Sequence, residues 1–307
     1  GVTTGKLIAF TAYISRFWQP INTIANFYNS VLTAVSYLER IFETIDEPVA
    51  VKDAPDAVQM PQIKGDVAFD HVTFSYEDGI PILHDVSFKV QQGETIAIVG
   101  PTGAGKTTIV NLLSRFYNVD RGTVKIDGID ISKVTLRSLR EQMGVMMQDS
   151  FIFSGTIMDN IRYGNKKASD EDVIRAAKTV CAHDFIVQME DGYNTQVNER
   201  GSRLSVGQRQ LISFARALLA DPAILILDEA TSSIDTETEL LLQKGLNELL
   251  KGRTSFIIAH RLSTIKNADC ILYVDKGDIL ERGNHDELME QKGEYYKLYM
   301  SQYDFLK

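Results

Sequence analysis

The 307-residue sequence has few cysteines and few histidines. Its two cysteines, Cys181 and Cys270, are too few for a disulfide framework and lack the spacing of metal ligands. We interpret both as small apolar side chains in a reducing, cytosolic compartment. Four of the five histidines also lack metal-ligand spacing and are assigned no function. They are His71, His84, His183 and His285.

Acidic residues outnumber basic residues, and the formal net charge is −9. A nucleic-acid surface needs a basic stripe that displaces counterions from phosphates, so we expect no nucleic-acid partner. Any nucleotide must therefore be held in a local site. With 44% apolar and 24% charged residues, the chain can bury the core of one large domain beside an appendage.

The sequence also lacks an initiator methionine and the pattern of a signal peptide, which is a basic stretch followed by an apolar run and a cleavage site. We therefore expect no signal peptide within these residues and interpret the chain as a fragment of a longer protein.

The first 45 residues contain no uninterrupted apolar run of about 20 residues, the length that a lipid-facing helix needs. Apolar side chains recur there at mostly helical intervals, which predicts one long helix or two. Lys6 and Arg16 interrupt the pattern, and Pro20 is expected to kink it. From these residues alone, an amphipathic soluble helix and a span lined by other helices or by a cavity both stay open.

Proline and acidic residues gather between Glu47 and Gly65, which is typical of a linker, and we place that linker at residues 46–62. In residues 63–307, short apolar runs alternate with helical stretches. The runs lie at 67–74, 95–99, 224–227 and 255–258. This alternation predicts an α/β domain with a mostly parallel sheet.

A glycine-rich loop follows the apolar run at 95–99 and leads into a helix predicted at 108–113, where Thr108 begins the helix. The loop consists of Gly100, Pro101, Thr102, Gly103, Ala104, Gly105, Lys106 and Thr107. Strand, glycine loop and helix come in the order of a phosphate-binding loop, whose backbone N–H groups and helix N-terminus bind phosphate oxygens. We expect Lys106 to bind the β and γ phosphates and the Thr107 hydroxyl to bind Mg²⁺.

Two carboxylates end the apolar run at 224–227. At the end of a central strand, Asp228 can hold Mg²⁺ and Glu229 can hold a water. The alternative is that the pair begins the next helix as favourable N-terminal charges.

The pentapeptide Leu-Ser-Val-Gly-Gln at 204–208 precedes a helix with an apolar face. Ser205 and Gln208 have the spacing of a capping box. Standing between the phosphate loop and the carboxylate strand, the pentapeptide resembles the signature motif of ATP-binding cassette (ABC) proteins. The resemblance implies that Ser205, Gly207 and Gln208 contact ATP held by a second such domain.

The resemblance covers nearly the whole sequence and implies a P-loop NTPase fold. That fold has a mostly parallel core sheet, an antiparallel β subdomain and an α-helical signature subdomain, here preceded by an N-terminal helical segment. The cofactors it implies are ATP and Mg²⁺.

Further roles follow from the same resemblance. Tyr76 matches the aromatic that stacks on adenine, Gln148 the glutamine that senses Mg²⁺ and the γ-phosphate, and Asp235 the aspartate of a dimer-contacting loop. The implied catalytic residues are Glu229 as general base and His260 as the switch histidine, with Lys106. Taken alone, each residue favours a different interpretation: Tyr76 as an exposed strand aromatic, Gln148 as a surface polar residue and Asp235 as a helix cap.

Residues 36–42, 148–156 and 195–201 resemble the exporter branch, although Gln196 and Asn198 depart from its commonest form. Residues 1–45 would then be the last transmembrane helix and its cytosolic extension, and 63–307 the nucleotide-binding domain at the cytoplasmic face of the cell membrane. The implied partners are a second nucleotide-binding domain, in a homo- or heterodimer, and the transmembrane domains.

The predicted function is ATP binding and hydrolysis in a nucleotide-sandwich dimer that powers export of a substrate. The alternative is a soluble ABC-type ATPase that acts as a mechanical switch, which would need tandem cassettes or a long coiled-coil insertion. A nucleoside kinase or GTPase would share the phosphate loop but lack the pentapeptide at 204–208.

Overall fold

The computed structural model describes residues 2–77, 79–147, 151–198, 201–228, 235–259 and 261–304. The chain separates into two compact units, residues 1–50 and residues 51–307.

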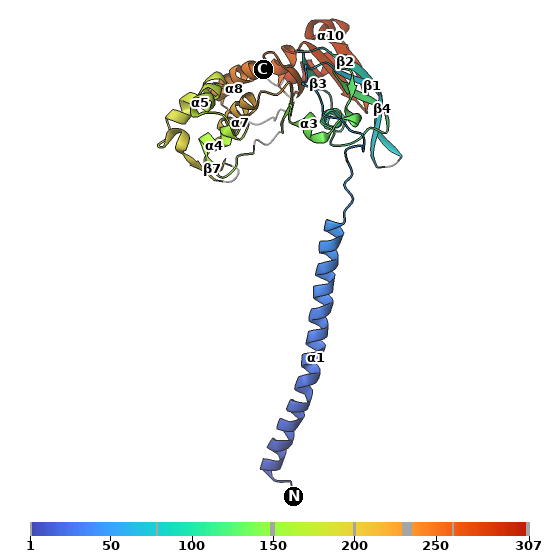
Figure 1. Ribbon diagram of the computed structural model, residues 1–307, viewed down its shortest axis with the longest axis vertical. Coiled ribbons are helices and arrows are strands. Elements are labelled where there is room, and N and C mark those ends of the chain that lie inside the picture. Colours follow the sequence, from blue (N-terminus) through green and yellow to red (C-terminus); the bar gives the residue numbers. More distant parts are fainter. Residues whose placement is uncertain are drawn as a thin grey trace. The chain divides into compact units, whose positions relative to one another are not determined.

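The first unit is one helix, α1 (Thr4–Ile45), which continues through Pro20 for 42 residues (Figure 1). The open choice between one helix and two is thereby settled in favour of one. None of its residues is buried, and its many aromatic and aliphatic side chains are exposed. Within the described residues, no helix combines the length and the apolar character that crossing a membrane requires.

The second unit is built on a six-stranded sheet with the order β12-β11-β3-β10-β9-β6. Its strands are β3 (Thr95–Val99), β6 (Met143–Met146), β9 (Ile224–Asp228), β10 (Thr254–Ile258), β11 (Cys270–Asp275) and β12 (Asp278–Gly283). All neighbouring pairs are parallel except the hairpin of β11 and β12. The predicted α/β domain with a mostly parallel sheet is confirmed.

A separate antiparallel sheet has the order β2-β1-β4-β5. It contains β1 (Val67–Glu77), β2 (Ile80–Val90), β4 (Arg121–Ile126) and β5 (Ile129–Asp130). Between the two sheets lies a core that includes the apolar face of α2 (Lys106–Leu113), with Ile109 and Leu113 fully buried.

The helical part of the unit gathers at the end opposite to the antiparallel sheet (Figure 1). It contains α4 (Ile157–Arg162), α5 (Asp170–Thr179), α6 (His183–Val187), α7 (Val206–Ala220) and the short strands β7 (Gly155–Thr156) and β8 (Gln196–Val197). α7 packs against α4, α5 and α8 (Thr236–Leu250). The remaining helices are α3 (Leu136–Arg140), α9 (Leu262–Lys266), α10 (His285–Gln291) and α11 (Glu294–Asp304), with 3₁₀ turns at Ile131–Lys133 and Gly192–Asn194.

The central strands separate two hydrophobic cores, because successive side chains of a strand point to opposite faces. In β3, Ile96 and Ile98 belong to the core beneath the antiparallel sheet, and Ala97 and Val99 belong to the core beneath α7. Both faces of β3 are thus buried, which explains the continuous apolar run in its sequence.

Candidate nucleotide-binding site

The predicted phosphate loop connects the carboxyl end of β3 to the first turn of α2. Gly100 and Gly105 have positive φ angles of 139° and 106°. A Cβ on Gly100 would lie 2.0 Å from the Val274 carbonyl oxygen, and one on Gly105 would lie 2.9 Å from Leu83 Cδ2. Glycine is therefore required at both positions by conformation and by space.

The N-terminus of α2 has no side-chain cap, since Gly105 precedes its first residue. The first N–H groups of a helix have no partner within the helix, and together with the helix dipole they form an anion-binding site. The tight glycine loop and the uncapped helix end fit the phosphates of a nucleotide.

Lys106 lies across the loop to which it belongs. Its Nζ donates hydrogen bonds of 2.8 Å to the carbonyl oxygens of Gly100 and Pro101, and the residue is 7% exposed. Burial lowers the pKa of the Lys106 amine, and the nearby Asp228 carboxylate opposes that shift. A phosphate group would give this amine the anionic partner that the loop carbonyls replace only in part.

Tyr76 lies beside the same helix end. Its hydroxyl is 3.1 Å from Thr108 Oγ1, and its ring packs edge-on against Phe74 and Tyr117, with centroids 4.9 and 5.0 Å away. Thr108 is buried, whereas Tyr76 stays 47% exposed. The structure thus brings a half-exposed aromatic ring to the phosphate loop, where a flat base could stack on it.

Asp228 ends β9 beside Ile258 of β10 and interacts electrostatically with Lys106. The predictions for Gln148, Glu229 and His260 fall outside the described residues. The strands that precede these three positions, β6, β9 and β10, are parallel neighbours in the sheet. Their carboxyl ends therefore meet at one edge, where ligands of open α/β sheets bind.

Among the described residues, no group of three or more histidine, cysteine or acidic side chains could by itself hold a metal ion. Mg²⁺ does not need such a group, because it keeps several waters and uses one or two protein oxygens beside substrate phosphates. Thr107, exposed in the first turn of α2, and Asp228 carry oxygen donors of the required kind.

The pentapeptide at 204–208 forms the start of α7. Ser205 Oγ accepts a hydrogen bond of 3.2 Å from the Gln208 N–H, and Gln208 Oε1 accepts one of 3.0 Å from the Ser205 N–H. The predicted capping box is confirmed. A Cβ on Gly207 would lie 2.2 Å from Thr238 Cγ2, so this glycine lets α7 approach α8 closely.

Asp235 is the N-cap of α8, the alternative that the sequence left open for it. Its Oδ1 accepts a hydrogen bond of 2.9 Å from the Thr238 N–H, and hydrogen bonding to that backbone lowers the pKa of the Asp235 carboxyl. Across the described part of the chain, no hydrogen bond or ion pair joins Asp235, Ser205 or Gly207 to Lys106.

Sequence reasoning missed Arg216 of α7. Its guanidinium donates to Asn160 O, Asn160 Oδ1 and Phe151 O at 2.8 to 2.9 Å and stacks over Phe153 and Tyr163. Burial lowers the pKa of Arg216. A cation between the apolar residues of a predicted amphipathic helix was the signal that could have identified it.

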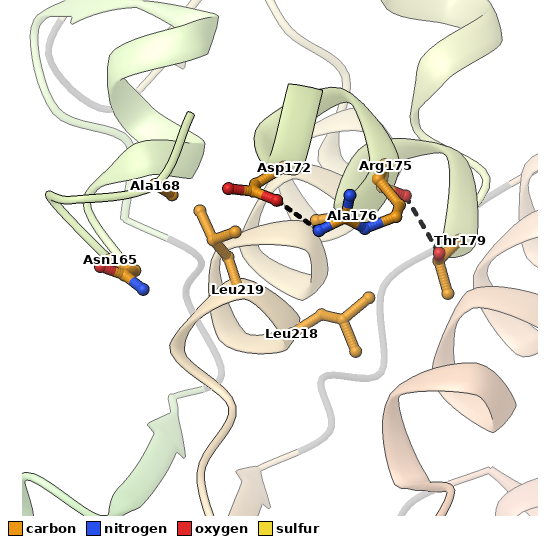
Figure 2. A pocket seen from close by; sticks show the side chains of 8 residues that line it. All are labelled: Asn165, Ala168, Asp172, Arg175, Ala176, Thr179, Leu218 and Leu219. Atoms are coloured by element: carbon orange, nitrogen blue, oxygen red, sulfur yellow. Dashed lines mark hydrogen bonds and ion pairs between the residues drawn. The ribbon is translucent and has the colours of Figure 1, made fainter. Parts of the chain in front are cut away.

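A surface pocket of ≈ 460 Å³ lies in the helical part of the unit (Figure 2). It lies between α5 and the end of α7, and Leu218 and Leu219 face Asp172, Arg175 and Thr179 across it. It contains none of the residues predicted to bind nucleotide.

A β-strand, a glycine loop and a helix on a mostly parallel sheet define a P-loop nucleotide-binding domain. The family model described as ABC transporter matches residues 83–232. An uncharacterized ABC transporter ATP-binding protein of Bacillus subtilis, YknV, is 54% identical over 98% of this chain and 50% of its own length. A fatty acid ABC transporter ATP-binding/permease protein of Mycobacterium tuberculosis is 47% identical over 97% of this chain and 47% of its own length.

The structure of a bacterial Atm1-family ABC exporter with ATP bound superposes with a TM-score of 0.80 at 40% identity. This match covers 98% of the chain and 52% of that exporter. The chain belongs to the ABC transporter family and contains its ATP-binding domain. It spans about half the length of the curated relatives it matches.

Proposed function

We propose that this chain is part of an ABC exporter in which ATP binding and hydrolysis drive a substrate across a membrane. The observation that carries the proposal is one domain that holds both a phosphate loop, with Lys106 beside Asp228, and a capped signature helix apart from that loop. The names of relatives join ATP binding to a permease or flippase, which favours transport over a soluble mechanical switch.

Residues 1–45 would be the last transmembrane helix and its cytosolic extension, followed by a linker at 46–62. The nucleotide-binding domain, residues 63–307, would then face the cytoplasm, and the transmembrane domains would be its partners. The match of this chain along 98% of its length to an exporter supports the assignment.

The chain's own residues would share the work at the site. Lys106 exchanges its bonds to the Gly100 and Pro101 carbonyls for phosphate oxygens, while the loop and α2 donate N–H groups. Thr107, Asp228 and Gln148 would hold Mg²⁺, which supplies positive charge against the phosphates when bound. Tyr76 would stack on the adenine.

Glu229 is proposed as the general base that accepts a proton from the attacking water, with His260 contacting the γ-phosphate. Phosphoryl transfer relies mainly on positioning and electrostatics, so these residues need fixed geometry more than unusual reactivity. We expect Glu229→Gln to keep ATP binding and lose nearly all turnover.

Two domains would be needed for each complete site. Among the contacts of the described residues, none is a polar contact of Ser205, Gly207 or Gln208 with Lys106 of their own domain. They would instead contact ATP held by a second domain, with Asp235 near the shared surface. Whether the second domain belongs to a copy of this chain or to a different chain, the same residues would serve.

The test is Mg²⁺-dependent ATP turnover measured against protein concentration, with Lys106→Ala as the inactive control. A shared site requires specific activity to rise with concentration and to vanish in the variant. Specific activity independent of concentration would point to a self-contained ATPase and would contradict the shared site.

A further inference from the structure

A short segment ahead of β1, residues 51–63, is held against the nucleotide-binding unit by hydrogen bonds, and we call it the strap. In its middle, Val58 forms a parallel bridge with Val134. The Val58 N–H donates to Lys133 O at 3.0 Å, and the Thr135 N–H donates to Val58 O at 2.9 Å. The strap therefore pairs with the segment that leads into α3.

The end of the strap is anchored on α3 and on Gln142, which follows that helix. The Met60 N–H donates to Ser138 Oγ and the Ile63 N–H donates to Gln142 Oε1, each at 2.8 Å. Met60 and Ile63 are only 6% and 5% exposed and belong to the core that contains α2. The amide of Gln142 also donates to Pro61 O at 2.9 Å.

Arg115 ties the start of the strap to the end of α2. Its guanidinium donates to Lys52 O at 3.2 Å and to Val134 O at 2.6 Å, and the residue is 3% exposed. Nearby, Asp53 Oδ1 accepts a hydrogen bond of 2.7 Å from the Leu136 N–H. Because a buried guanidinium without acceptors is costly, these two carbonyls must stay in place around Arg115.

The partners of Arg115 make its position depend on three segments at once. No ion pair joins it to a carboxylate within the described ranges, so its hydrogen bonds go to the strap, to Val134 and to Asn118. It follows α2 by two residues, and Lys106 is the first residue of that eight-residue helix. A shift of α2 along its axis would therefore move Lys106 and Arg115 together.

Nucleotide binding supplies a reason for such a shift. Lys106 now donates to Gly100 O and Pro101 O, and a phosphate group would draw its amine away from them. Ile109, Leu112 and Leu113 are at most 1% exposed, and such close packing favours movement of α2 as one body.

We propose that Arg115 is a positioning residue for the phosphate loop, through which nucleotide binding and docking of the strap stabilise each other. The inference rests on nucleotide binding at Lys106. Because coupling between two sites is reciprocal, ATP must slow opening of the strap by the same factor by which strap docking tightens ATP. The strap starts directly after the unit of residues 1–50, so this coupling would reach the point where the two units join in sequence.

Hydrogen exchange of the Val58 and Met60 amides measures strap opening directly. We expect saturating ATP, with Mg²⁺ withheld to prevent turnover, to slow their exchange by ~10-fold in the unaltered chain. The Asp172 amide, bonded to Ser169 Oγ in α5, should not respond, which separates strap docking from general stabilisation. ATP affinity is measured in parallel by titration calorimetry.

Arg115→Gln should abolish the ATP response of the strap and weaken ATP binding by the same ~10-fold. Asp53→Ala, at an exposed position, should reduce the response without disturbing the buried end of α2. The matched control is Arg137→Gln, since the Arg137 side chain is exposed and, within the described part of the chain, bonds only to Glu141. It should behave like the unaltered chain.

ATP binding without any change in strap exchange would overturn the coupling while leaving the proposed function intact. A full strap response in both Arg115→Gln and Asp53→Ala would overturn the role of Arg115. Absence of ATP binding in the unaltered chain would overturn both proposals.

Discussion

Ser205 caps α7, and a second capping box in the same chain allows that role to be separated from the proposed contact of the same hydroxyl with ATP. Ser169 caps α5 through Asp172 with the same reciprocal bonds that Ser205 makes with Gln208. We expect Ser205→Ala and Ser169→Ala each to lower the free energy of unfolding by about 1 kcal/mol. Only Ser205→Ala should also lower ATP turnover, by tenfold or more, because only Ser205 would contact ATP across the dimer.

Urea denaturation and steady-state turnover of the two variants give these numbers. Equal turnover in Ser205→Ala and Ser169→Ala would show that Ser205 acts only as a helix cap.

Gly207 is constrained by packing independently of any nucleotide. In Gly207→Ala, the new methyl group would meet Thr238 Cγ2 at 2.2 Å, and we expect a loss of about 1–3 kcal/mol in stability. Thr238→Ser removes that methyl group and should recover most of the loss. A double-mutant cycle by chemical denaturation measures the recovery. If the two changes add without interaction, the contact between α7 and α8 is not the reason for the glycine.

Among the elements, α7 packs against α4 and also donates hydrogen bonds from Arg216 to the segment at 151–164. Lysine in its place keeps the charge but replaces at most part of a fork that makes three hydrogen bonds. We expect Arg216→Lys to cost about 2–3 kcal/mol, because Asn160 Oδ1 and two backbone carbonyls lose a donor. Thermal and urea unfolding would show it, and Arg175→Lys, at an exposed position of α5, is the control. Equal effects of the two changes would contradict the role of the fork.

Contact between α10 and α11 makes stability depend on pH through His285. Its Nδ1 shares a hydrogen bond of 2.7 Å with the hydroxyl of the fully buried Tyr295. Burial lowers the pKa of His285, and Lys266 adds to the shift while Asp286 opposes it. The unfolded chain therefore binds this proton first, so the contribution is complete above about pH 6.5 and is lost as the pH falls toward the folded-state pKa.

We expect the midpoint of urea unfolding to decrease when the pH is lowered from 7.5 to 5.5. The decrease should be smaller in His285→Gln. The same decline in both proteins would show that other groups cause it.

The elements that the sequence predicted well are those with strong local patterns. The apolar runs at 95–99 and 224–227 form β3 and β9, and the spacing of Ser205 and Gln208 forms the capping box. Other contacts join residues 19 to 76 positions apart, namely the hydrogen bond of Arg115 to Val134, the contact of Gly207 with Thr238 and the pairing of Val58 with Val134. Local periodicity does not predict such contacts, because contacts between residues so far apart in the sequence depend on tertiary packing.

For the whole molecule, the strap affects how stable a chain shortened at its N-terminus can be. A chain of residues 51–307 keeps the anchors at Lys52, Met60 and Ile63, whereas a chain of residues 64–307 loses them. Burying Met60 and Ile63 contributes about 1.5–3 kcal/mol each. We expect the shorter chain to be less stable by at least about 3 kcal/mol, as measured by urea unfolding. Equal stability would show that the strap is only loosely attached.

The alternation of β3 between two cores limits how the length of this chain can change during evolution. Loss or gain of one residue within Thr95–Val99 would exchange Ile96 and Ile98 with Ala97 and Val99, so that large side chains would enter the space of small ones on one face and leave voids on the other. The same slip would move Gly100 away from the Val274 carbonyl. Substitutions can accumulate in this strand one at a time. A single-residue insertion or deletion there would disrupt both cores and the phosphate loop in one event.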